Sequence, residues 1–356
     1  MNMGYYLTRN INNEDLSFDE ALQLFDLSLP QVGIIADEIR KERCGDVVTF
    51  VGDRIINYTN KCTSKCKFCA FYARDNEDAF VLSKEEILKK IEEAVKAGTT
   101  QIMIQGGLNP QLRIKWFEDL FSTIKERFEG VQVHSLSPPE IHYLAKIEKI
   151  SIKEVLHRLN NAGLDSLPGG GAEILTDRVR SDLSPRKVDA NGWLEVMRTT
   201  HELGMKSTAT MMLGHIEEDK DIVEHLFRIR DLQAETGGFT AFIPWTFEAE
   251  RTELFHRVKK VASPTRFLQV LAISRIILHN IKNLQTSWLT QNKDIAKLSL
   301  FFGANDFSGT MIEENVVRAT GKEIMPATAE EIINAAKNVG RTVAQRNTNY
   351  EILRYF

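Results

Sequence analysis

The sequence has few cysteines and no long apolar run, and both features narrow the class of protein. Four cysteines in 356 residues are too few for a disulfide-stabilised extracellular scaffold. No run approaches the roughly 18 consecutive apolar residues that a membrane span needs. The first residues also lack the basic-then-apolar pattern of a secretory leader. We therefore expect a cytoplasmic protein with no membrane partner.

Charge of one sign is not concentrated anywhere in the chain. The net charge is −4, and acidic and basic residues alternate along the sequence. Nucleic-acid-binding proteins need a basic patch or stripe, so we expect no nucleic-acid partner. No low-complexity linker or Pro/Gly-rich segment divides the chain into two large domains.

Three of the four cysteines lie within eight residues, at the spacing C-x3-C-x2-C. They are Cys62, Cys66 and Cys69, in the string NKCTSKCKFC. Three thiolates in one loop can bind three irons of a cubane cluster and leave the fourth iron open to a chelating ligand. Zinc is the alternative, but structural zinc sites are usually closed by four ligands from two separated pairs. The fourth cysteine, Cys44, lies eighteen residues upstream, so the spacing favours an iron–sulfur cluster without excluding zinc.

Short apolar runs alternate with amphipathic stretches, which is typical of an α/β fold. This alternation predicts a parallel (β/α)8 barrel of the TIM type. We expect a helical N-terminal extension at 1–50, the barrel at 51–320, and a C-terminal helical segment at 321–356 packed on the barrel. The predicted strands are 54–59, 101–106, 131–136, 166–170, 207–213, 239–245, 284–288 and 298–303.

Local signals support two of the helices between these strands. Ser83 and Glu86 form a capping box at the start of a helical repeat. Ser263 followed by Pro264 is an N-cap with proline at the first helical position. The cysteine loop follows the first predicted strand, so it lies on the C-terminal face, where barrel enzymes build their active sites. The ends of the other strands are therefore expected to supply the rest of the site.

The string NYTNKCTSKCKFC (57–69) resembles the cysteine loop of the radical S-adenosylmethionine enzymes. Strings at the ends of the other strands resemble one branch of that superfamily, the menaquinone and deazaflavin group. They are MIQGGLNP (103–110), HSLSPPEI (134–141), AGLDSLPGGGAEIL (162–175), IPWTFEAERTEL (243–254), SWLTQNKD (287–294) and FFGANDFSGTMIEENVV (301–317).

This resemblance implies a [4Fe–4S] cluster held by Cys62, Cys66 and Cys69, with S-adenosylmethionine on the fourth iron. Phe68 matches an aromatic position that shields the cluster from water. The implied partners are a small-molecule substrate, dehypoxanthine futalosine, and an unidentified one-electron donor such as flavodoxin or ferredoxin. A carbon radical is quenched by nearby thiols, so Cys44 is expected to lie away from the substrate cavity. A sister enzyme, aminofutalosine synthase, shares the cysteine loop, and a non-catalytic metal-binding protein is the remaining alternative.

Two glycine-rich turns are candidates for binding S-adenosylmethionine. Gln105, Gly106 and Gly107 resemble the turn that contacts its amino group, although Leu108 stands where relatives often carry glutamate. A tight strand-to-helix turn would also need paired glycines.

Consecutive glycines after the fourth predicted strand, Gly170 and Gly171 among them, allow close approach of the backbone to a ligand. Glu173 can accept two hydrogen bonds from vicinal ribose hydroxyls. The alternative for Glu173 is a helix-start glutamate that is stabilised by the helix dipole.

Five further residues are candidates for contacts with ligands. Tyr72 is expected to pack on or hydrogen-bond the adenine, or only to pack the loop. The remaining four lie at or just after the ends of the third, fifth and eighth predicted strands, so we expect them to face the substrate: His134, His215, Asn305 and Asp306. A neutral imidazole at such a position can take a proton or orient a carboxylate, although a lone histidine is more often structural.

Overall fold

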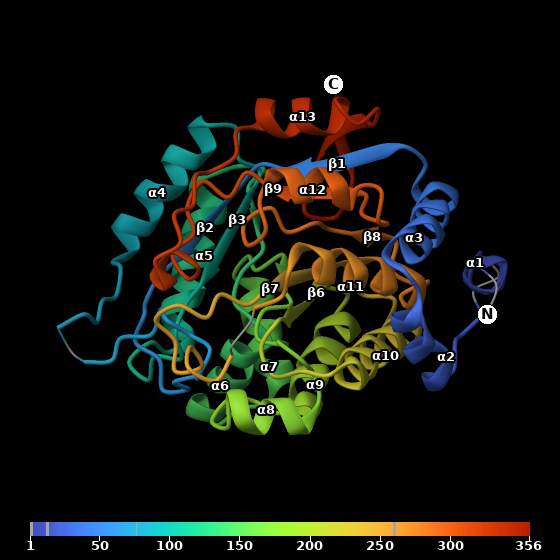
Figure 1. Ribbon diagram of the computed structural model, residues 1–356. Helices are drawn as coiled ribbons and strands as arrows, with labels where there is room; N and C mark the ends of the chain where they lie inside the picture. The colour runs from blue at the N-terminus through green and yellow to red at the C-terminus, as the bar shows by residue number, and fades with distance from the viewer. Residues whose placement is uncertain (1–2, 12–13, 76, 259–260) are drawn as a thin grey trace.

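The chain folds into an α/β structure with strands inside and helices outside (Figure 1). The computed structural model describes residues 3–11, 14–75, 77–258 and 261–356. The strands are β1 (Val47–Val51), β2 (Asp53–Asn57), β3 (Gln101–Gln105), β4 (Gln132–Val133), β5 (Ser166–Leu167), β6 (Lys206–Leu213), β7 (Phe239–Thr246), β8 (Asn283–Leu284), β9 (Asp306–Gly309), β10 (Thr342–Arg346) and β11 (Ile352–Tyr355).

The helices connect successive strands and cover the outside of the sheet. They are α1 (Met3–Ile11), α2 (Phe18–Leu22), α3 (Leu29–Cys44), α4 (Lys84–Lys96), α5 (Ile114–Arg127), α6 (Pro138–Glu148), α7 (Ile152–Asn161), α8 (Asp177–Leu183), α9 (Ala190–Glu202), α10 (Asp219–Thr236), α11 (Pro264–Ile277), α12 (Lys293–Ser299) and α13 (Ala329–Lys337), with 3-10 turns η1 (Gln23–Asp26) and η2 (Arg318–Thr320). Among the described helices, none is both long and apolar enough to cross a membrane.

The strands form three hydrogen-bonded sheets that follow one another around the core. Their orders are β2-β3-β4, β5-β6-β7-β8 and β11-β10-β1-β9, and the pairs are parallel except β10 with β11. Single parallel bridges, His134 to Ser166 and Gln285 to Asp306, link the sheets. The residues after β9 close the ring of strands onto β1 and β2, because Thr310 N donates to Val51 O and Ile312 N donates to Asp53 O. This closed order of parallel strands is consistent with the predicted barrel.

Caps and apolar faces explain the helices next to the site. The capping box of Ser83 and Glu86 is present at the start of α4, and Ser263 caps α11 with Pro264 in its first turn. The apolar face of α4 buries Ile87, Leu88, Ile91 and Ala94 against the sheet. The sequence predictions for both helix starts are confirmed.

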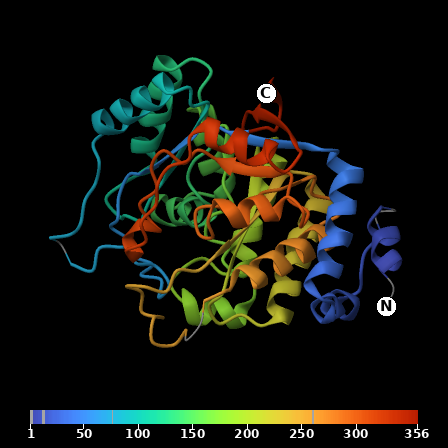
Figure 2. The same ribbon diagram turned by 45° about the horizontal axis from the view of Figure 1, so that its top comes forward.

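The N-terminal helices stand together along one side of the barrel (Figure 2). Helix α3 packs against α11, and α1 packs against α3. Among the described residues before the barrel, the chain forms α1, α2, η1 and α3, which ends at Cys44, and β1 begins at Val47, ahead of the predicted boundary at residue 50.

The predicted eighth strand at 298–303 is wrong. Residues 298 and 299 end α12, where Ser299 Oγ donates to Ile295 O as in a helix, and a turn follows. Phe302 of this apolar run packs on α3 instead. A Cβ on Gly33 of that helix would lie 2.7 Å from the Phe302 ring. The strand at this place in the ring is β9, which begins only at Asp306.

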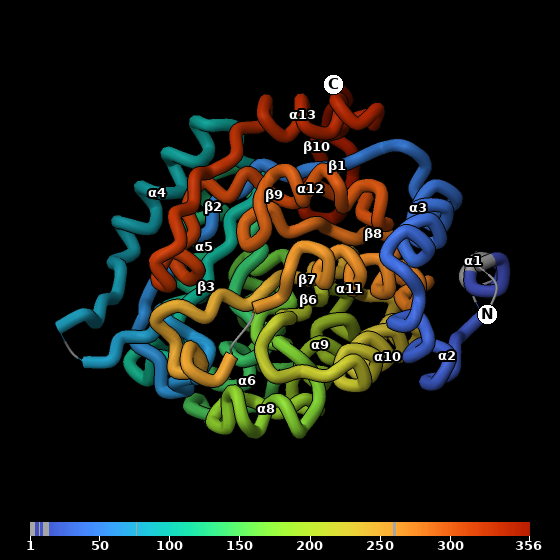
Figure 3. The backbone as a smooth tube through the Cα atoms, in the orientation of Figure 1, coloured from blue at the N-terminus to red at the C-terminus, as the bar shows by residue number. Residues whose placement is uncertain are grey.

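The C-terminal segment at 321–356 is only partly helical, which corrects the sequence expectation. After α13 the chain forms the hairpin of β10 and β11, and β10 lies beside β1 (Figure 3). The pairing places Thr342 opposite Val47 and Gln345 opposite Phe50. The hairpin therefore lies at the N-terminal end of the β1–β2 segment, opposite the end that carries the cysteine loop.

Candidate functional site

The cysteine loop begins five residues after the end of β2 and is held against the next strand. Thr63 N donates to Leu108 O and Gly107 N donates to Thr59 O, both at 3.0 Å. These bonds tie both sides of the loop to the turn after β3. The loop therefore lies at the C-terminal ends of the strands, as the sequence predicted.

All three cysteines line one cavity of about 390 Å³. They are free thiols, with Cys66 buried and Cys62 and Cys69 half-buried. The volume lies within the range of small-molecule sites, roughly 300–1,000 Å³. The cavity runs from these cysteines to Arg346 and Tyr350 at and after β10.

The donor set fits a cluster better than a single metal ion. Within the described residues, no three His, Cys, Asp or Glu side chains form a group that could hold one ion. A zinc ion would need its thiolates at about 2.3 Å, whereas in a cubane each thiolate binds a different iron. Three free thiols in one short loop that line one cavity match the second case.

Burial governs the protonation of two of these thiols. It raises the pKa of Cys66, which also contacts Ser64 Oγ at 3.2 Å, and raises the pKa of Cys69 to about 11. Metal ligands must be thiolates, so cluster binding would release these protons. Phe68 lines the cavity, and the Lys187 ammonium lies 5.3 Å from its ring centroid.

The turn after β3 has glycines because neighbouring atoms leave no room for side chains. A Cβ on Gly107 would lie 2.3 Å from Lys61 O, and one on Gly106 would lie 2.8 Å from the Tyr58 ring. Gln105 lines the cavity and donates through Nε2 to Leu136 O at 3.1 Å. The paired glycines therefore have a structural reason, and they also leave the backbone of the turn exposed to the cavity.

A carboxylate does lie at this turn, although Leu108 replaces the family glutamate. Glu140, at the start of α6, accepts from Gly106 N at 3.1 Å and from Tyr58 Oη at 2.8 Å, and Ser137 Oγ donates to its other oxygen. Burial raises the pKa of Glu140 to about 7. Its hydrogen bonds fix the turn, and the sequence analysis had assigned it no role.

The glycines after β5 bring the backbone close to its neighbours. A Cβ on Gly169 would lie 2.6 Å from Thr208 O, and one on Gly171 would lie 2.3 Å from Pro139. Gly170 and Gly171 both line the cavity. Gly171 has φ of +81°, a conformation that side-chain-bearing residues rarely adopt.

Glu173 has the properties expected of a ligand-binding carboxylate. It is buried, lines the cavity, and takes φ of +42°. Lys187 Nζ donates to Oε1 at 2.8 Å, while Oε2 is buried and has no partner among the described residues. Helix α8 begins only at Asp177, so the helix-start alternative is wrong. A buried carboxylate oxygen without a donor fits a ribose hydroxyl.

Tyr72 and His134 line the cavity, but each already has a partner. Tyr72 Oη donates to Glu253 Oε1 at 2.9 Å, so only its ring remains available to an adenine. His134 Nδ1 lies 2.7 Å from Ser166 Oγ inside the barrel. Burial lowers the pKa of His134 to about 3, so its imidazole is neutral near pH 7.

His215 is not among the residues that line the cavity. Its Nε2 lies 3.0 Å from Met212 O, and its Nδ1 accepts from Ile216 N at 2.7 Å. The ring is buried in its own loop after β6. The expectation that it faces the substrate is not met, because both nitrogens are used to shape that loop.

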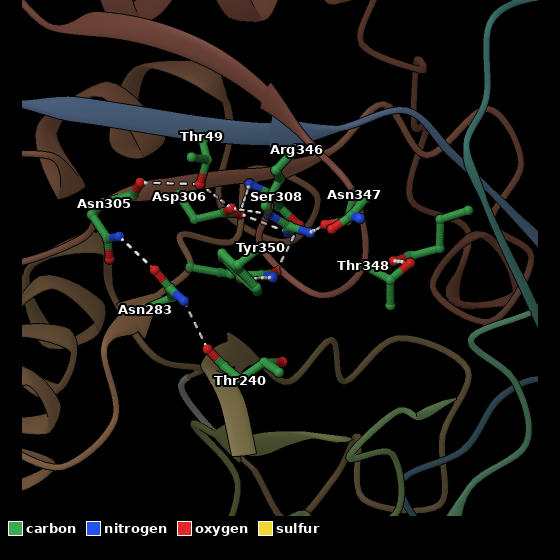
Figure 4. Close-up of polar contacts among 12 residues, drawn as sticks. Thr49, Thr240, Asn283, Asn305, Asp306, Ser308, Arg346, Asn347, Thr348 and Tyr350 are labelled. Atoms are coloured by element: carbon green, nitrogen blue, oxygen red, sulfur yellow. Dashed lines mark hydrogen bonds and ion pairs between the residues drawn. The ribbon is translucent and has the colours of Figure 1, made fainter. Parts of the chain in front are cut away.

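Asn305 and Asp306 lie at the opposite end of the strand from the one predicted. They stand at the start of β9, with Asp306 in register with Thr49 of β1, because the eighth strand is not at 298–303. Asn305 bonds Arg275 and Asn283, and Asp306 pairs with Arg346 (Figure 4). Neither residue lines the cavity, so the predicted substrate contacts are not supported.

Several residues of the cavity carried no sequence signal. Lys187 reaches it from the segment between α8 and α9, and Arg346 and Tyr350 reach it from the C-terminal hairpin. Asp53 lies inside the barrel on β2. Cys44 lies outside the cavity, with Sγ 3.3 Å from Lys282 O, as expected.

Two family profiles match the chain. Residues 56–229 match the radical SAM superfamily, and residues 236–355 match the CofH/MqnC C-terminal region. The cyclic dehypoxanthine futalosine synthase of Halalkalibacterium halodurans is 44% identical over 359 aligned positions, covering 100% of this chain and 96% of that protein.

Another relative carries a different name. The 5-amino-6-(D-ribitylamino)uracil–L-tyrosine 4-hydroxyphenyl transferase of Methanococcus maripaludis is 41% identical, covering 97% of this chain and 99% of that protein. Among solved structures, methylornithine synthase (PylB) superposes with a TM-score of 0.75 at 16% identity, covering 94% of this chain and 96% of that one. That likeness concerns the fold alone.

Proposed function

The chain belongs to the radical S-adenosylmethionine superfamily, and from that premise we propose that it converts dehypoxanthine futalosine to cyclic dehypoxanthine futalosine. This reaction is part of the futalosine route to menaquinone. The observation that carries the proposal is the 44% identity, along the whole chain, to the Halalkalibacterium halodurans synthase.

As a radical SAM enzyme, the protein uses a [4Fe–4S] cluster and S-adenosylmethionine. Cys62, Cys66 and Cys69 would hold three irons, and S-adenosylmethionine would chelate the fourth. The chemistry that this group supplies when bound is one-electron cleavage of S-adenosylmethionine to methionine and a 5′-deoxyadenosyl radical. The electron would come from a donor such as flavodoxin or ferredoxin.

The chain's own residues would bind and orient the cosubstrate. The Glu173 oxygen that lacks a donor would accept from the ribose hydroxyls, while Lys187 fixes the other oxygen. The backbone after Gln105, held by Glu140, would face the amino group. These roles match the chemistry of the groups that line the cavity.

The substrate would occupy the part of the cavity that lies deeper in the barrel. Met103, Ile243 and Trp245 give that part an apolar wall, which excludes water from a reactive carbon radical. Hydrogen abstraction from ribose carbon 4′, followed by radical addition to the benzoate ring, would give the spiro product.

Anaerobic incubation of reduced, cluster-loaded protein with S-adenosylmethionine and dehypoxanthine futalosine tests the proposal. We expect cyclic product and one free 5′-deoxyadenosine per product. Deoxyadenosine without cyclic product would contradict it. Cys62→Ala, Cys66→Ala and Cys69→Ala should each abolish both products, and turnover in any one of them would contradict the ligand assignment.

The transferase named among the relatives is the second candidate, because its identity to this chain is nearly as high. Incubation with L-tyrosine and 5-amino-6-(D-ribitylamino)uracil tests it directly. Aminofutalosine synthase activity is separated by stoichiometry, since that reaction would consume the adenosyl group in its product. A non-catalytic metal protein would cleave no S-adenosylmethionine at all.

A further inference from the structure

Four buried carboxylates line the cavity: Asp53, Glu140, Glu173 and Glu314. Glu140 accepts three hydrogen bonds, from Tyr58, Gly106 and Ser137. Glu173 is paired with Lys187 and faces the expected cosubstrate. Glu314 accepts from Val316 N and Val317 N, one donor on each oxygen, both at 2.8 Å.

Asp53 is the fourth of these carboxylates and lies deepest in the barrel. It begins β2, and four residues of extended chain, about 13 Å, separate it from Asn57 at the cysteine end. Its Oδ1 accepts from Met311 N at 2.7 Å. A Cβ on Gly309 would lie 2.1 Å from the same oxygen, so the glycine makes the room that this carboxylate occupies.

The charged groups around Asp53 come from three other strands or their ends. Asp306 of β9 and Arg346 of β10 form a buried ion pair (Figure 4). The Arg346 guanidinium carbon lies 3.9 Å from the centroid of the Tyr350 ring. His134, which follows β4, is neutral because of its low pKa. When both carboxylates are ionised, Asp53, Asp306 and Arg346 together carry one net negative charge in the barrel.

We propose that Asp53 accepts the proton that the benzoate ring loses during cyclisation. This inference rests on the proposed function. When the ribose radical adds to an unsubstituted ring carbon, a carbon–carbon bond forms and aromaticity is lost. Restoring it breaks that carbon's C–H bond: the proton passes to the Asp53 carboxylate, and the remaining electron would be accepted by the oxidised iron–sulfur cluster that Cys62, Cys66 and Cys69 would hold.

The placement and the acidity of Asp53 both suit this role. With the cosubstrate near the cysteines, the substrate ring lies deeper, where Asp53 faces the cavity. Burial raises the pKa of Asp53 to about 6, Arg346 lowers it and Asp306 raises it. A base is most effective when its pKa lies near the working pH.

The test compares Asp53→Asn with wild type by measuring cyclic product and 5′-deoxyadenosine separately, from pH 5 to 8. Asparagine keeps the shape and can still accept from Met311 N. We expect cyclic product to fall about 100-fold, while formation of 5′-deoxyadenosine by hydrogen abstraction, which precedes the proton transfer, continues. Asp53→Glu, which keeps a carboxylate, should restore part of the product. Asp294→Asn, at an exposed aspartate on α12, is the matched control.

The pH profile distinguishes this role from a structural one. Wild-type cyclisation should decline on the acid side as Asp53 becomes protonated. Asp306→Asn removes a neighbouring negative charge, so the acid limb should move to lower pH. The inference would be overturned if Asp53→Asn cyclised at a third or more of the wild-type rate. It would also be overturned if Asp306→Asn left the acid limb in place or moved it to higher pH. A wild-type protein that makes no cyclic product would instead overturn the proposed function.

Discussion

Replacement of Gly107 by alanine should displace the cysteine loop without unfolding the barrel. The new Cβ would lie 2.3 Å from Lys61 O and 2.8 Å from the Cys62 Cβ, whereas ordinary contact begins at 3.4 Å. The obstacle is backbone and cannot rotate away. The turn and the loop must therefore separate by about 1 Å, a misplacement that can cost about 100-fold in rate.

Anaerobic reconstitution followed by iron, sulfide and 5′-deoxyadenosine analysis measures this effect. We expect Gly107→Ala to hold less iron per chain and to cleave S-adenosylmethionine about 100-fold more slowly. Gly130→Ala is the matched control, because nothing lies within 4 Å of its Cβ and its φ of +77° adds backbone strain alone. A Gly107→Ala protein with wild-type iron content and wild-type cleavage would refute the role of this turn.

Three other changes test separate parts of the structure. Glu173→Gln removes a buried charge that faces the cosubstrate, so S-adenosylmethionine should bind about 2 kcal/mol more weakly, or about 30-fold in Kd by anaerobic titration; an unchanged Kd would exclude the ribose contact. Arg346→Met leaves Asp306 buried and unpaired, which should lower the free energy of unfolding by about 3–5 kcal/mol in denaturant; a change below about 1 kcal/mol would contradict the burial of that pair. Burial lowers the pKa of His201 to about 4, so the neutral ring stabilises the fold above its unfolded pKa near 6.5, and this stabilisation is lost as the pH falls. The stability difference between wild type and His201→Gln should therefore shrink by about 2 kcal/mol from pH 7.5 to 5.0, and a constant difference would disprove the assignment.

The sequence was most informative where chemistry or backbone conformation requires one residue type. The spacing of Cys62, Cys66 and Cys69 located the site, and the two glycine turns located its neighbours around the cavity. Strands such as β6 and β7 were recognisable because they are runs of apolar residues and threonine between amphipathic helices. Local patterns of this kind are carried by neighbouring residues, so they can be read without the fold.

The errors came from features that depend on distant contacts. In the run at 298–303, Phe302 packs on Gly33 of α3 while Leu298 and Phe301 are exposed, and an apolar helix end of this kind resembles a buried strand in sequence. Because of this one misplaced strand, Asn305 and Asp306 were predicted after the C-terminal end of a strand, whereas they lie at the start of β9. Lys187 has no local signal, because only the tertiary fold brings it to Glu173.

The C-terminal hairpin shows the same limit. Arg346 and Tyr350 line the cavity because β10 pairs with β1, nearly 300 residues earlier in the chain. Asp53 begins β2 and belongs to no motif, whereas His134 lies in HSLSPPEI and was predicted to face the substrate. A sequence pattern therefore finds the metal loop more readily than the groups that act on the substrate.

Isotope transfer from the substrate tests the central claim most directly. Dehypoxanthine futalosine that carries deuterium at ribose carbon 4′ is incubated anaerobically with the reduced, cluster-loaded protein and S-adenosylmethionine, and both products are analysed by mass spectrometry. The account predicts one deuterium in each 5′-deoxyadenosine and an equal amount of cyclic product. Unlabelled deoxyadenosine, or a labelled substrate recovered intact while S-adenosylmethionine is cleaved, would contradict it.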